Sequence, residues 1–458
     1  MYLMKNNFWH NDIHKKIMKI AWPTIVEQVL IMMVGIVSTI LVSRLGKESL
    51  AAVGMVNYIV NFIQTIFTGL STGCMIVVAR VLGESDVKHV NNVLIQSLII
   101  GVIVSFIIFI PNFLFSNSII KLFYSSVELE VLEIAAVYYK LIFIGMPFVI
   151  VEMIVSGSLR GIGDTKTPLY ITTIVNIINF MLSAILIYGV HLFDFINIDG
   201  LGVKGAAIAS TTARIIGAVL ILYVLYNKKA KIHLSMSDDY KFNIGIVKRI
   251  IKIGIPSFLE NLIMQGGFLL VQIVISGIGT AQIAAYQVGG NIHGLAIMPI
   301  LGIATTATAL VGRDLGAENY DEADTYAKES RKLSLSIAIV LGLLEFIFAR
   351  EIAYLFSSDP EVIEYSCIVI RGFALLEPFM GIERVSASVL RTAGDLIYVI
   401  VTSVIALWLF RIVTVVIISK IFSTTLEIVM LGAFLDYAIR AGMYIVRMRT
   451  GKWKTLKV

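Results

Sequence analysis

The stretch SGSLRGIGDTKTP, residues 156–168, interrupts a chain that is otherwise strongly apolar. A related stretch, ASVLRTAGD, occupies residues 387–395. In each copy an arginine suits the carbonyl-rich end of a helix, and a following glycine permits a left-handed turn. An aspartate just after the turn can cap the next helix. We therefore predict two structural elbows, formed by Arg160, Gly163 and Asp164 and by Arg391, Gly394 and Asp395. The alternative is a direct functional role of these residues.

The composition indicates a membrane protein. The chain has 458 residues, of which 58% are hydrophobic and only 15% are charged. Its apolar runs are long enough to cross a hydrocarbon layer of about 30 Å as helices, and they are continuous rather than alternating, which argues against a β-barrel. We predict an all-α protein with twelve spans, near 18–42, 50–79, 91–114, 131–157, 167–190, 201–226, 250–277, 283–311, 333–349, 362–388, 397–419 and 425–447. Polar residues in the second and eighth spans suggest that these could be broken or tilted.

Lysine and arginine residues orient the spans. They concentrate in the segments that face inward if both termini are cytoplasmic, including the long loop after the sixth span. The net charge of +6 is therefore a consequence of topology, and we predict no nucleic-acid partner. The expected location is the cell (inner) membrane, with multiple passes.

The two halves of the chain repeat each other. A shift of 233 residues places Pro23 on Pro256 and Glu27 on Glu260, and a shift of 231 residues places the first elbow on the second. Six helices per copy is an even number, so both copies have the same orientation. The sequence thus predicts an N-lobe (1–226), a cytoplasmic linker (227–248) and a C-lobe (249–458). Parallel repeats of this kind suit alternating access to a central site.

Four motifs together resemble the multidrug and toxic compound extrusion (MATE) family, in its bacterial type. They are LVSRLGKESLAAVG after the first span, LRGIGDTKTP after the fourth, GVKGAAIAS at the sixth and RMRTGKWK at the tail. Their joint order covers essentially the whole chain. The resemblance implies a V-shaped pair of helix bundles that exports organic, often cationic, compounds in exchange for Na⁺ or H⁺.

This sequence departs from the family at two acidic positions. Many members have an aspartate in the first helix and another in the fifth. Ser38 and Ser183 stand at those positions here. The asparagine that precedes the second aspartate by four residues in the family is kept, as Asn179. A hydroxyl group does not carry a proton near neutral pH and is a poor sole ligand for Na⁺. The usual ion switch of the N-lobe is therefore in doubt.

Two glutamates are candidates for ion or substrate binding, because ionisable groups inside spans are costly. Glu260 lies four residues after Pro256, in a helix where many family members use an acid for cation coupling. The alternative is a hydrated carboxylate near the interface. Glu27 is its repeat mate and could serve the N-lobe in place of the missing aspartate, although a hydrated position is the favoured interpretation at its shallow depth.

Other charged residues inside the spans are predicted to form ion pairs. Glu152 and Glu383 are repeat mates in the fourth and tenth spans, and the tenth span also holds Arg371, Glu377 and Arg384. Asp436 and Arg440 have the i, i+4 spacing of a pair on one helix. We expect these groups to stabilise the bundle.

Uncharged polar residues form a second candidate set. Thr172, Asn176, Asn179 and Ser183 follow one face of the fifth span. This stripe could line a cavity or could join neighbouring helices by hydrogen bonds. Gln265 and Gln287 give the seventh and eighth spans a comparable polar content.

We predict no enzymatic activity and no bound cofactor beyond a coupling ion, Na⁺ or H⁺. No catalytic constellation is present, no phosphate-binding glycine loop occurs, and the histidines lack metal-ligand spacing. The expected partners are a small organic substrate and membrane lipids, and the expected state is a monomer. The leading hypothesis is an ion-driven exporter. The alternatives are a flippase for a lipid or lipid-linked head group, with Arg214 and Arg384 as contacts, and a protein that no longer transports.

Overall fold

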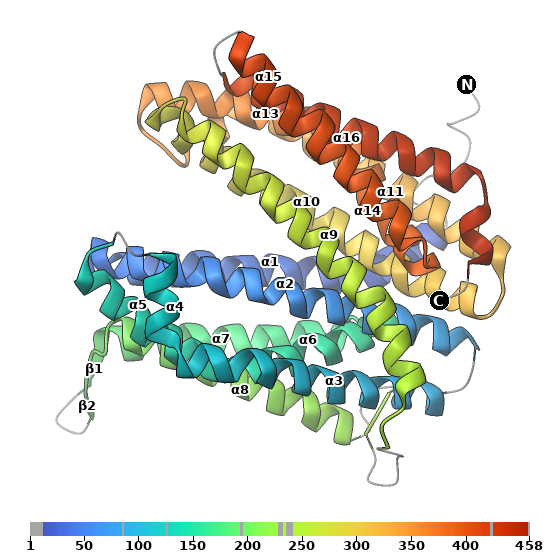
Figure 1. Ribbon diagram of the computed structural model, residues 1–458, viewed down its shortest axis with the longest axis horizontal. Helices are drawn as coiled ribbons and strands as arrows, with labels where there is room; N and C mark the ends of the chain where they lie inside the picture. Colours follow the sequence, from blue (N-terminus) through green and yellow to red (C-terminus); the bar gives the residue numbers. More distant parts are fainter. Residues whose placement is uncertain are drawn as a thin grey trace. The chain divides into compact units, whose positions relative to one another are not determined.

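The computed structural model describes residues 12–84, 87–124, 127–192, 196–227, 232–234, 241–421 and 425–456. These ranges are almost entirely helical (Figure 1). One short antiparallel hairpin, β1 (Gly189–Leu192) and β2 (Ile196–Asp199), follows the fifth predicted span and adds a detail to the predicted all-α class. Within the predicted linker, residues 228–231 and 235–240 lie outside the described residues.

Each predicted span corresponds to a helix or to consecutive helical segments. The first half of the chain contains α1 (Asp12–Ser43), α2 (Lys47–Glu84), α3 (Val87–Leu114), α4 (Ser116–Phe123), α5 (Leu129–Ile144), α6 (Met146–Gly161), α7 (Lys166–Tyr188) and α8 (Val203–Tyr226). The second half contains α9 (Ile244–Ser276), α10 (Thr280–Gly316), α11 (Tyr320–Ile347), α12 (Ala349–Tyr354), α13 (Pro360–Ala393), α14 (Leu396–Val404), the π-helical segment Ile405–Ile412, α15 (Val413–Ile421), α16 (Leu426–Arg449) and a terminal 3₁₀ turn (Lys452–Thr455).

Ten described helical spans are long and apolar enough to cross a membrane, and the bent pair of α5 and α6 would make an eleventh. The helix α11 occupies the place of the ninth predicted span. Its first half is charged, so its apolar part is short. The sequence predicts twelve spans, whereas the structure has up to eleven helical spans that pass by length and composition among the described residues. The helix α11 accounts for the difference.

The break in the helical spans falls in the fourth, not in the second or eighth. There α5 and α6 meet at an angle of 46°. Gly145 separates them, and Pro147 lies in the first turn of α6. Proline lacks a backbone N–H group and disfavours helical backbone just before it, which accounts for the bend. In contrast, α2 and α10 are continuous, so neither is broken, and the other expectation for them, a tilt, stays a prediction.

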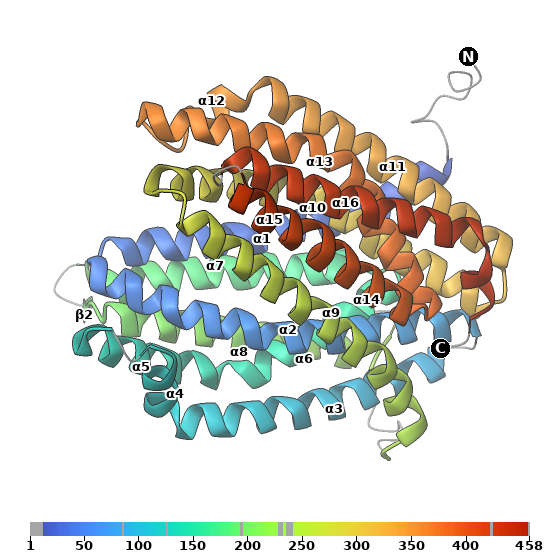
Figure 2. The ribbon, with the colours of Figure 1, turned by 45° about the horizontal axis from the view of Figure 1, so that its top comes forward.

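The described residues divide into two compact units. The N-terminal unit comprises Val26–Val78 and Ser85–Ile251, and the C-terminal unit comprises Lys252–Val458 together with the beginning of α1 up to Ile25 and the end of α2, Ala79–Glu84. In the N-terminal unit α7 packs against α8, and α3 packs against α6 (Figure 1). In the C-terminal unit α13 packs against α10, α11 and α16 (Figure 2). The predicted lobe boundaries stay a prediction.

Within the C-terminal unit, the ends of α2 and α10 approach each other very closely. A Cβ atom on Gly83 would lie 1.9 Å from the carbonyl oxygen of Arg313, and one on Gly316 would lie 2.0 Å from the carbonyl oxygen of Arg80. Only glycine fits at either position without a shift of the backbone. Gly83 and Gly316 are repeat mates, so the crossing has the same construction from both sides.

Arg80 continues this contact toward the second elbow. Its guanidinium group donates to the carbonyl oxygens of Thr392 at 3.0 Å and Ala393 at 2.9 Å. It also donates to the carbonyl oxygen of Leu456 at 3.3 Å. These carbonyl groups end α13 and the chain's terminal turn, where backbone acceptors lack partners of their own. Arg80 therefore fixes the end of α2 to the end of α13.

Candidate functional site

The two elbows have the same backbone geometry. Gly163 and Gly394 have φ values of +80° and +94°. Each glycine N–H group donates to the carbonyl oxygen of the elbow arginine, at 2.9 Å for Arg160 and 3.0 Å for Arg391. The two elbows differ in their aspartates. Asp164 accepts from the N–H group of Thr167 at 3.1 Å, as a helix cap does. Asp395 is paired at 2.6 Å with Arg447 of α16.

In the N-terminal unit, the first elbow lies beside Glu27 of α1. Arg160 Nη2 is 2.7 Å from Glu27 Oε1, and Arg160 Nε is 3.3 Å from Glu27 Oε2. Thr172 of α7 adds a hydrogen bond of 3.4 Å from its hydroxyl group to Glu27 Oε1. Glu27 is 1% exposed. The glutamate is thus buried and paired, not hydrated at an interface as the favoured interpretation of the sequence held.

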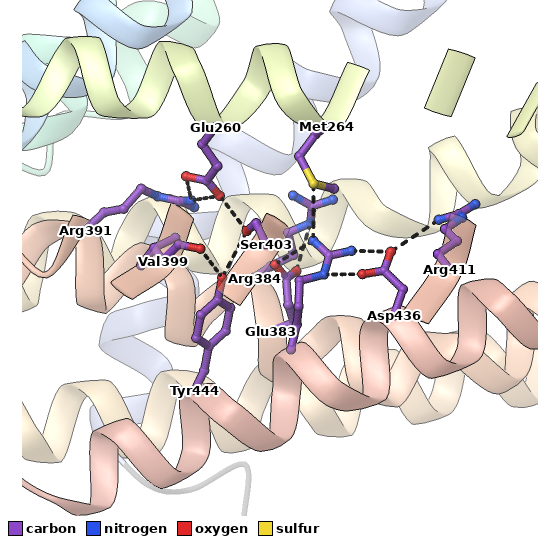
Figure 3. Close-up of polar contacts among 11 residues, drawn as sticks. Glu260, Met264, Glu383, Arg384, Arg391, Val399, Ser403, Arg411, Asp436 and Tyr444 are labelled. Atoms are coloured by element: carbon purple, nitrogen blue, oxygen red, sulfur yellow. Dashed lines mark hydrogen bonds and ion pairs between the residues drawn. The ribbon is translucent and has the colours of Figure 1, made fainter. Parts of the chain in front are cut away.

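In the C-terminal unit, the second elbow lies beside Glu260 of α9 (Figure 3). Arg391 Nη1 donates to both carboxylate oxygens of Glu260, at 2.9 Å and 2.8 Å. Ser403 of α14 donates to Glu260 Oε1 at 3.4 Å. The repeat therefore preserves a whole interaction, because both partners of the pair have mates in the other half. Removing one partner of such a buried pair is costly, whereas protonation or a competing cation can release it.

Beside this pair, the C-terminal unit contains a buried cluster of charged groups (Figure 3). Asp436 and Arg440 of α16 are paired at 2.8 Å, which confirms the predicted helical ion pair. Arg440 also lies 3.4 Å from Glu383 of α13, and Glu383 lies 3.3 Å from its neighbour Arg384. Arg411 of the π-helical segment lies 3.5 Å from Asp436. We call these five residues the charged cluster. It holds three guanidinium groups and two carboxylates.

The N-terminal unit has a smaller version of this cluster. Glu152 of α6, the repeat mate of Glu383, lies 3.7 Å from Arg214 of α8. The Arg214 side chain is 37% exposed, whereas that of Arg440 is 1% exposed. The predicted ion pairs of the fourth and tenth spans are therefore present in both halves. In the second half, Arg440, Asp436 and Arg411 enlarge the pair into a cluster, whereas in the first half Glu27 and Arg160 are the further charges that act on Glu152.

The N-terminal unit instead contains a pocket without charged side chains. Its volume is about 240 Å³, and it lies between α1 and α7. Ser38, Asn176 and Asn179, all candidates from the sequence, line it together with Leu30, Met33, Val34, Val37, Leu41, Thr173, Ile177 and Phe180. The lining is mainly apolar, with a few polar groups, as is typical of sites for small organic molecules.

The polar stripe of α7 contributes both to the pocket and to helix contacts, so the two alternatives for it coexist. Asn176 lines the pocket and donates to the carbonyl oxygen of Leu30 on α1 at 3.1 Å. Ser183 is buried and donates to Asn179 Oδ1 at 3.3 Å. In the C-terminal unit, Gln265 and Gln287 are exposed. Two of the four stripe residues, Asn176 and Asn179, thus line one cavity, and the other two form hydrogen bonds beside it.

Sequence reasoning missed two functional features. It assigned Arg160 and Arg391 to helix ends, whereas each is also the partner of a candidate glutamate. The matching shifts of the glutamates and the arginines were a signal for this pairing. It also did not single out Arg411. A π-helical segment adds one residue to a turn and is frequent at functional sites, but nothing in the apolar run around Arg411 indicates it.

No metal centre is evident in the described ranges, where no three His, Cys, Asp or Glu side chains converge as ligands. Cys74 is a buried free thiol and Cys367 is a half-buried one. These observations leave the ion pairs, the charged cluster and the pocket as the features that a function must use.

Comparison with known proteins identifies the family. A family model described as MatE matches residues 23–185 and 256–417, one match in each half. The chain is 26% identical over 450 residues to a probable multidrug resistance protein NorM of Thermotoga maritima, covering 97% of this chain and 94% of that protein. It is 24% identical over 358 residues to the FAD transporter of Shewanella oneidensis, covering 77% and 76%.

Solved structures show the same fold. A crystal structure of MATE in complex with MaL6 aligns over 98% of both chains with a TM-score of 0.88 at 23% identity. A Pyrococcus furiosus transporter of the MOP superfamily, described as having a binding pocket of reverse polarity, aligns equally well. The predicted resemblance and fold class are confirmed. The chain is a multi-pass membrane protein and belongs to the MATE family of efflux transporters, which are not enzymes.

Proposed function

We propose that this protein is a secondary active exporter of small amphipathic organic compounds, cations among them, driven by the inward movement of Na⁺ or H⁺ through alternating access. The observation that carries the proposal is the pocket of the N-terminal unit. Its apolar lining removes hydrocarbon surface from water without demanding one shape, and its amide and hydroxyl groups can orient a ligand.

The driving ion is proposed to act on the Glu260–Arg391 pair. A proton or a sodium ion competes with the guanidinium group for the same carboxylate oxygens, and either one neutralises Glu260 when Arg391 moves away. The charge of Arg391 then needs a new partner, so the second elbow must shift. Because the elbow connects α13 to α14, a local change of charge becomes a movement of helices.

The close crossing of α2 and α10 provides a contact that such a movement can release. The helix ends meet backbone to backbone at Gly83 and Gly316, and Arg80 ties them to the second elbow. A contact of this kind is either fully formed or lost, because its fit depends on glycine at both positions. We propose that it forms in one state of the transport cycle and opens in the other.

Ion-driven flux is the test. Purified protein in liposomes is given a fluorescent organic cation and, separately, an imposed Na⁺ gradient or pH gradient. One of the gradients is expected to drive export. Glu260→Gln should reduce that export at least roughly tenfold, a barrier change of about 1.4 kcal/mol, while substrate binding persists. Glu130→Gln, at an exposed position in the first turn of α5, is the control.

Two outcomes would reject parts of this proposal. Export by Glu260→Gln at the wild-type rate would show that the pair does not carry the coupling. Absence of export under either gradient, in protein that still binds the dye, would reject ion-driven export itself. The relatives are described as multidrug resistance proteins and transporters, and no contact among the described residues favours the alternative of a lipid flippase.

We also propose that both termini are cytoplasmic and that the protein functions as a monomer in the inner membrane. The distribution of basic residues supports this orientation. Tags at the two ends should be accessible to a membrane-impermeant label only after the cytoplasmic face is opened.

A further inference from the structure

A second buried group of titratable side chains lies in the C-terminal unit, apart from Glu260 and the charged cluster. His293 of α10 and Glu377 of α13 form an ion pair of 2.8 Å between Nδ1 and Oε1. The imidazole ring stacks on Phe373 with ring centres 4.3 Å apart and planes 9° from parallel. Glu377 is fully buried. The pair is therefore held in place from two sides.

Glu345 of α11 completes this group. It is 7% exposed. Three residues before it, Gly342 allows α11 to approach α13 closely, since a Cβ atom there would lie 2.6 Å from the carbonyl oxygen of Ala374 and 3.3 Å from the Cβ atom of Glu377. Residues three apart lie on the same face of a helix, so Glu345 faces α13 one turn from this contact. Three neighbouring helices thus each contribute one titratable group.

Both glutamates have an oxygen without a partner. Oε2 of Glu345 and Oε2 of Glu377 are buried and form no hydrogen bond within the described part of the chain. Buried polar atoms are normally paired, so two adjacent exceptions require an explanation. A proton on one carboxyl group supplies it, because the new O–H group can donate to an acceptor that is otherwise empty.

The charges around the group lead to the same conclusion. Glu377 pairs with His293, and Glu345 interacts with Glu377 from the neighbouring helix. His293 is the only basic side chain in the described ranges that forms an ion pair with either carboxylate. Arg371, on α13, instead lies over the ring of Phe346 and is exposed. Tyr286 of α10 lies with its ring centre 6.1 Å from that of Phe373, and its hydroxyl group accepts a hydrogen bond from Arg411 at 3.5 Å. Two buried negative charges against one positive charge are unfavourable, and a bound proton removes the excess.

The group is specific to the second half of the chain. The shifts that superpose the repeats place His293 on Val60 and Glu377 on Met146, and both of these residues are apolar. The repeated helix packing therefore does not require an acid or an imidazole at these positions. Internal duplication alone does not account for the group.

We propose that His293, Glu345 and Glu377 form a proton-binding site in the C-terminal unit, distinct from the Glu260–Arg391 pair. A proton from water forms an O–H bond with a carboxylate oxygen of Glu345 or Glu377, and its release restores the carboxylate. A metal ion fits less well, because no three ligating side chains converge within the described residues. The site deepens the proposed function by naming the proton as a transported ion, and it rests on that function for the coupling step only.

Proton binding is tested first, without transport. Infrared difference spectra between neutral and alkaline pH are recorded for purified wild type, Glu345→Gln and Glu377→Gln, with Glu361→Gln at an exposed position of α13 as the control. The wild type and the control should show a protonated-carboxyl band that disappears on alkalinisation. Glu345→Gln and Glu377→Gln should each lose roughly half of this band or more, since the proton is shared by the two carboxyl groups.

Replacement of the histidine gives a readout that a purely structural role would not change. In His293→Asn the two carboxyl groups have lost their cation, so the band should persist to a higher pH than in the wild type. Unchanged band intensity in both glutamine variants, at wild-type thermal stability, would overturn the proposal. If one variant does not fold, the other and the histidine variant still decide the question.

The coupling step is tested by flux driven by a pH gradient. Glu377→Gln should lose roughly tenfold of the rate, at unchanged dye binding. Equal rates in the wild type and Glu377→Gln would reject the coupling role and leave the proposed exporter intact. No flux in the wild type under any gradient would instead reject the proposed function, and the infrared result would still stand on its own.

Discussion

The two units share one interaction and differ in what surrounds it. In both, a glutamate of the first helix of the repeat pairs with the arginine of an elbow, at 2.7 Å for Glu27–Arg160 and 2.8 Å for Glu260–Arg391. Beside the second pair lies the charged cluster, and the same unit holds, apart from both, the group of His293, Glu345 and Glu377. Beside the first pair lies a pocket lined only by uncharged residues.

This difference distinguishes features that both repeats have from features that differ between them. Backbone geometry at the elbows and the glutamate–arginine pairs follow the repeat, so they are parts of the fold. The Glu383 pair has a smaller counterpart in Glu152 and Arg214, whereas Asp436, Arg440 and Arg411 enlarge the cluster of the second half, and the described pocket of the first half is uncharged. We infer that the N-terminal unit favours the binding of organic compounds and that the C-terminal unit favours the binding of the driving ion.

The largest expected effect is on the ion pairs between the fourth and sixth helices of each repeat. Arg440→Leu leaves Glu383 and Asp436 buried without their main cation, and it should destabilise the protein by about 3–5 kcal/mol. Arg214→Leu removes a half-exposed partner 3.7 Å from Glu152 and should cost about 1 kcal/mol or less. Thermal unfolding in detergent measures both. Equal losses would contradict the asymmetry between the units.

At the crossing of α2 and α10, by contrast, we expect equal losses of stability from substitutions at the two repeat mates, Gly83 and Gly316. Gly83→Ala and Gly316→Ala each place a Cβ atom against a carbonyl oxygen, so each should cost about 1–3 kcal/mol or abolish the contact. Gly442→Ala, where a Cβ atom meets open space, is the control. A clear difference between the two mates would mean that the crossing is not a symmetric element of the repeat.

The pocket can be given a carboxylate at Ser38, the position where the family resemblance implies an aspartate. Ser38→Asp adds a carboxylate to an uncharged lining, so organic cations should bind roughly tenfold more tightly and their neutral analogues should not. Fluorescence titration with a matched pair of dyes measures this. Identical changes for both dyes would show that Ser38 does not face the bound compound.

The smallest effect concerns charges outside the apolar spans. Glu329 of α11 accepts from Lys332 and lies 2.8 Å from His14. Burial, the largest influence, raises the pKa of Glu329, but the hydrogen bonds from Lys332 and His14 outweigh it and hold this pKa below its ordinary value. A lowered pKa stabilises the folded state above the ordinary value of 4.5, and this contribution is lost as the pH falls through the folded value.

Thermal stability should therefore fall below about pH 4.5 by a few tenths of a kcal/mol through this contact, and Glu329→Gln should remove that part of the decline. The neighbouring Asp324, paired with Lys328 and Lys454, serves as a comparison that keeps its own contribution. If the acid decline were identical in Glu329→Gln and the wild type, the contact would not stabilise the protein.

The sequence was a good guide where local chemistry decides the structure. Hydropathy located every helical span, because a membrane-spanning segment must be both apolar and helical. The glycine and aspartate of each elbow indicated a turn, because few residues adopt a positive φ. The repeat followed from polar residues and prolines at fixed shifts.

Features that depend on tertiary packing were not accessible in this way. Arg160 and Glu27 lie 133 residues apart, and no local pattern states that they meet. The bend at Gly145 and the π-helical turn at Arg411 follow from how neighbouring helices pack. Glu345 was not singled out, because an acid near the end of an apolar run is usually a solvated residue.

The central claim, that the driving ion acts in the C-terminal unit, is tested most directly by gradient-driven export in liposomes with the two mates compared side by side. Glu260→Gln should lose export at least roughly tenfold, and Glu27→Gln, matched in chemistry and in position within the repeat, should keep most of it at equal dye binding. Loss of export in Glu27→Gln alone would contradict the claim and assign the ion to the N-terminal unit.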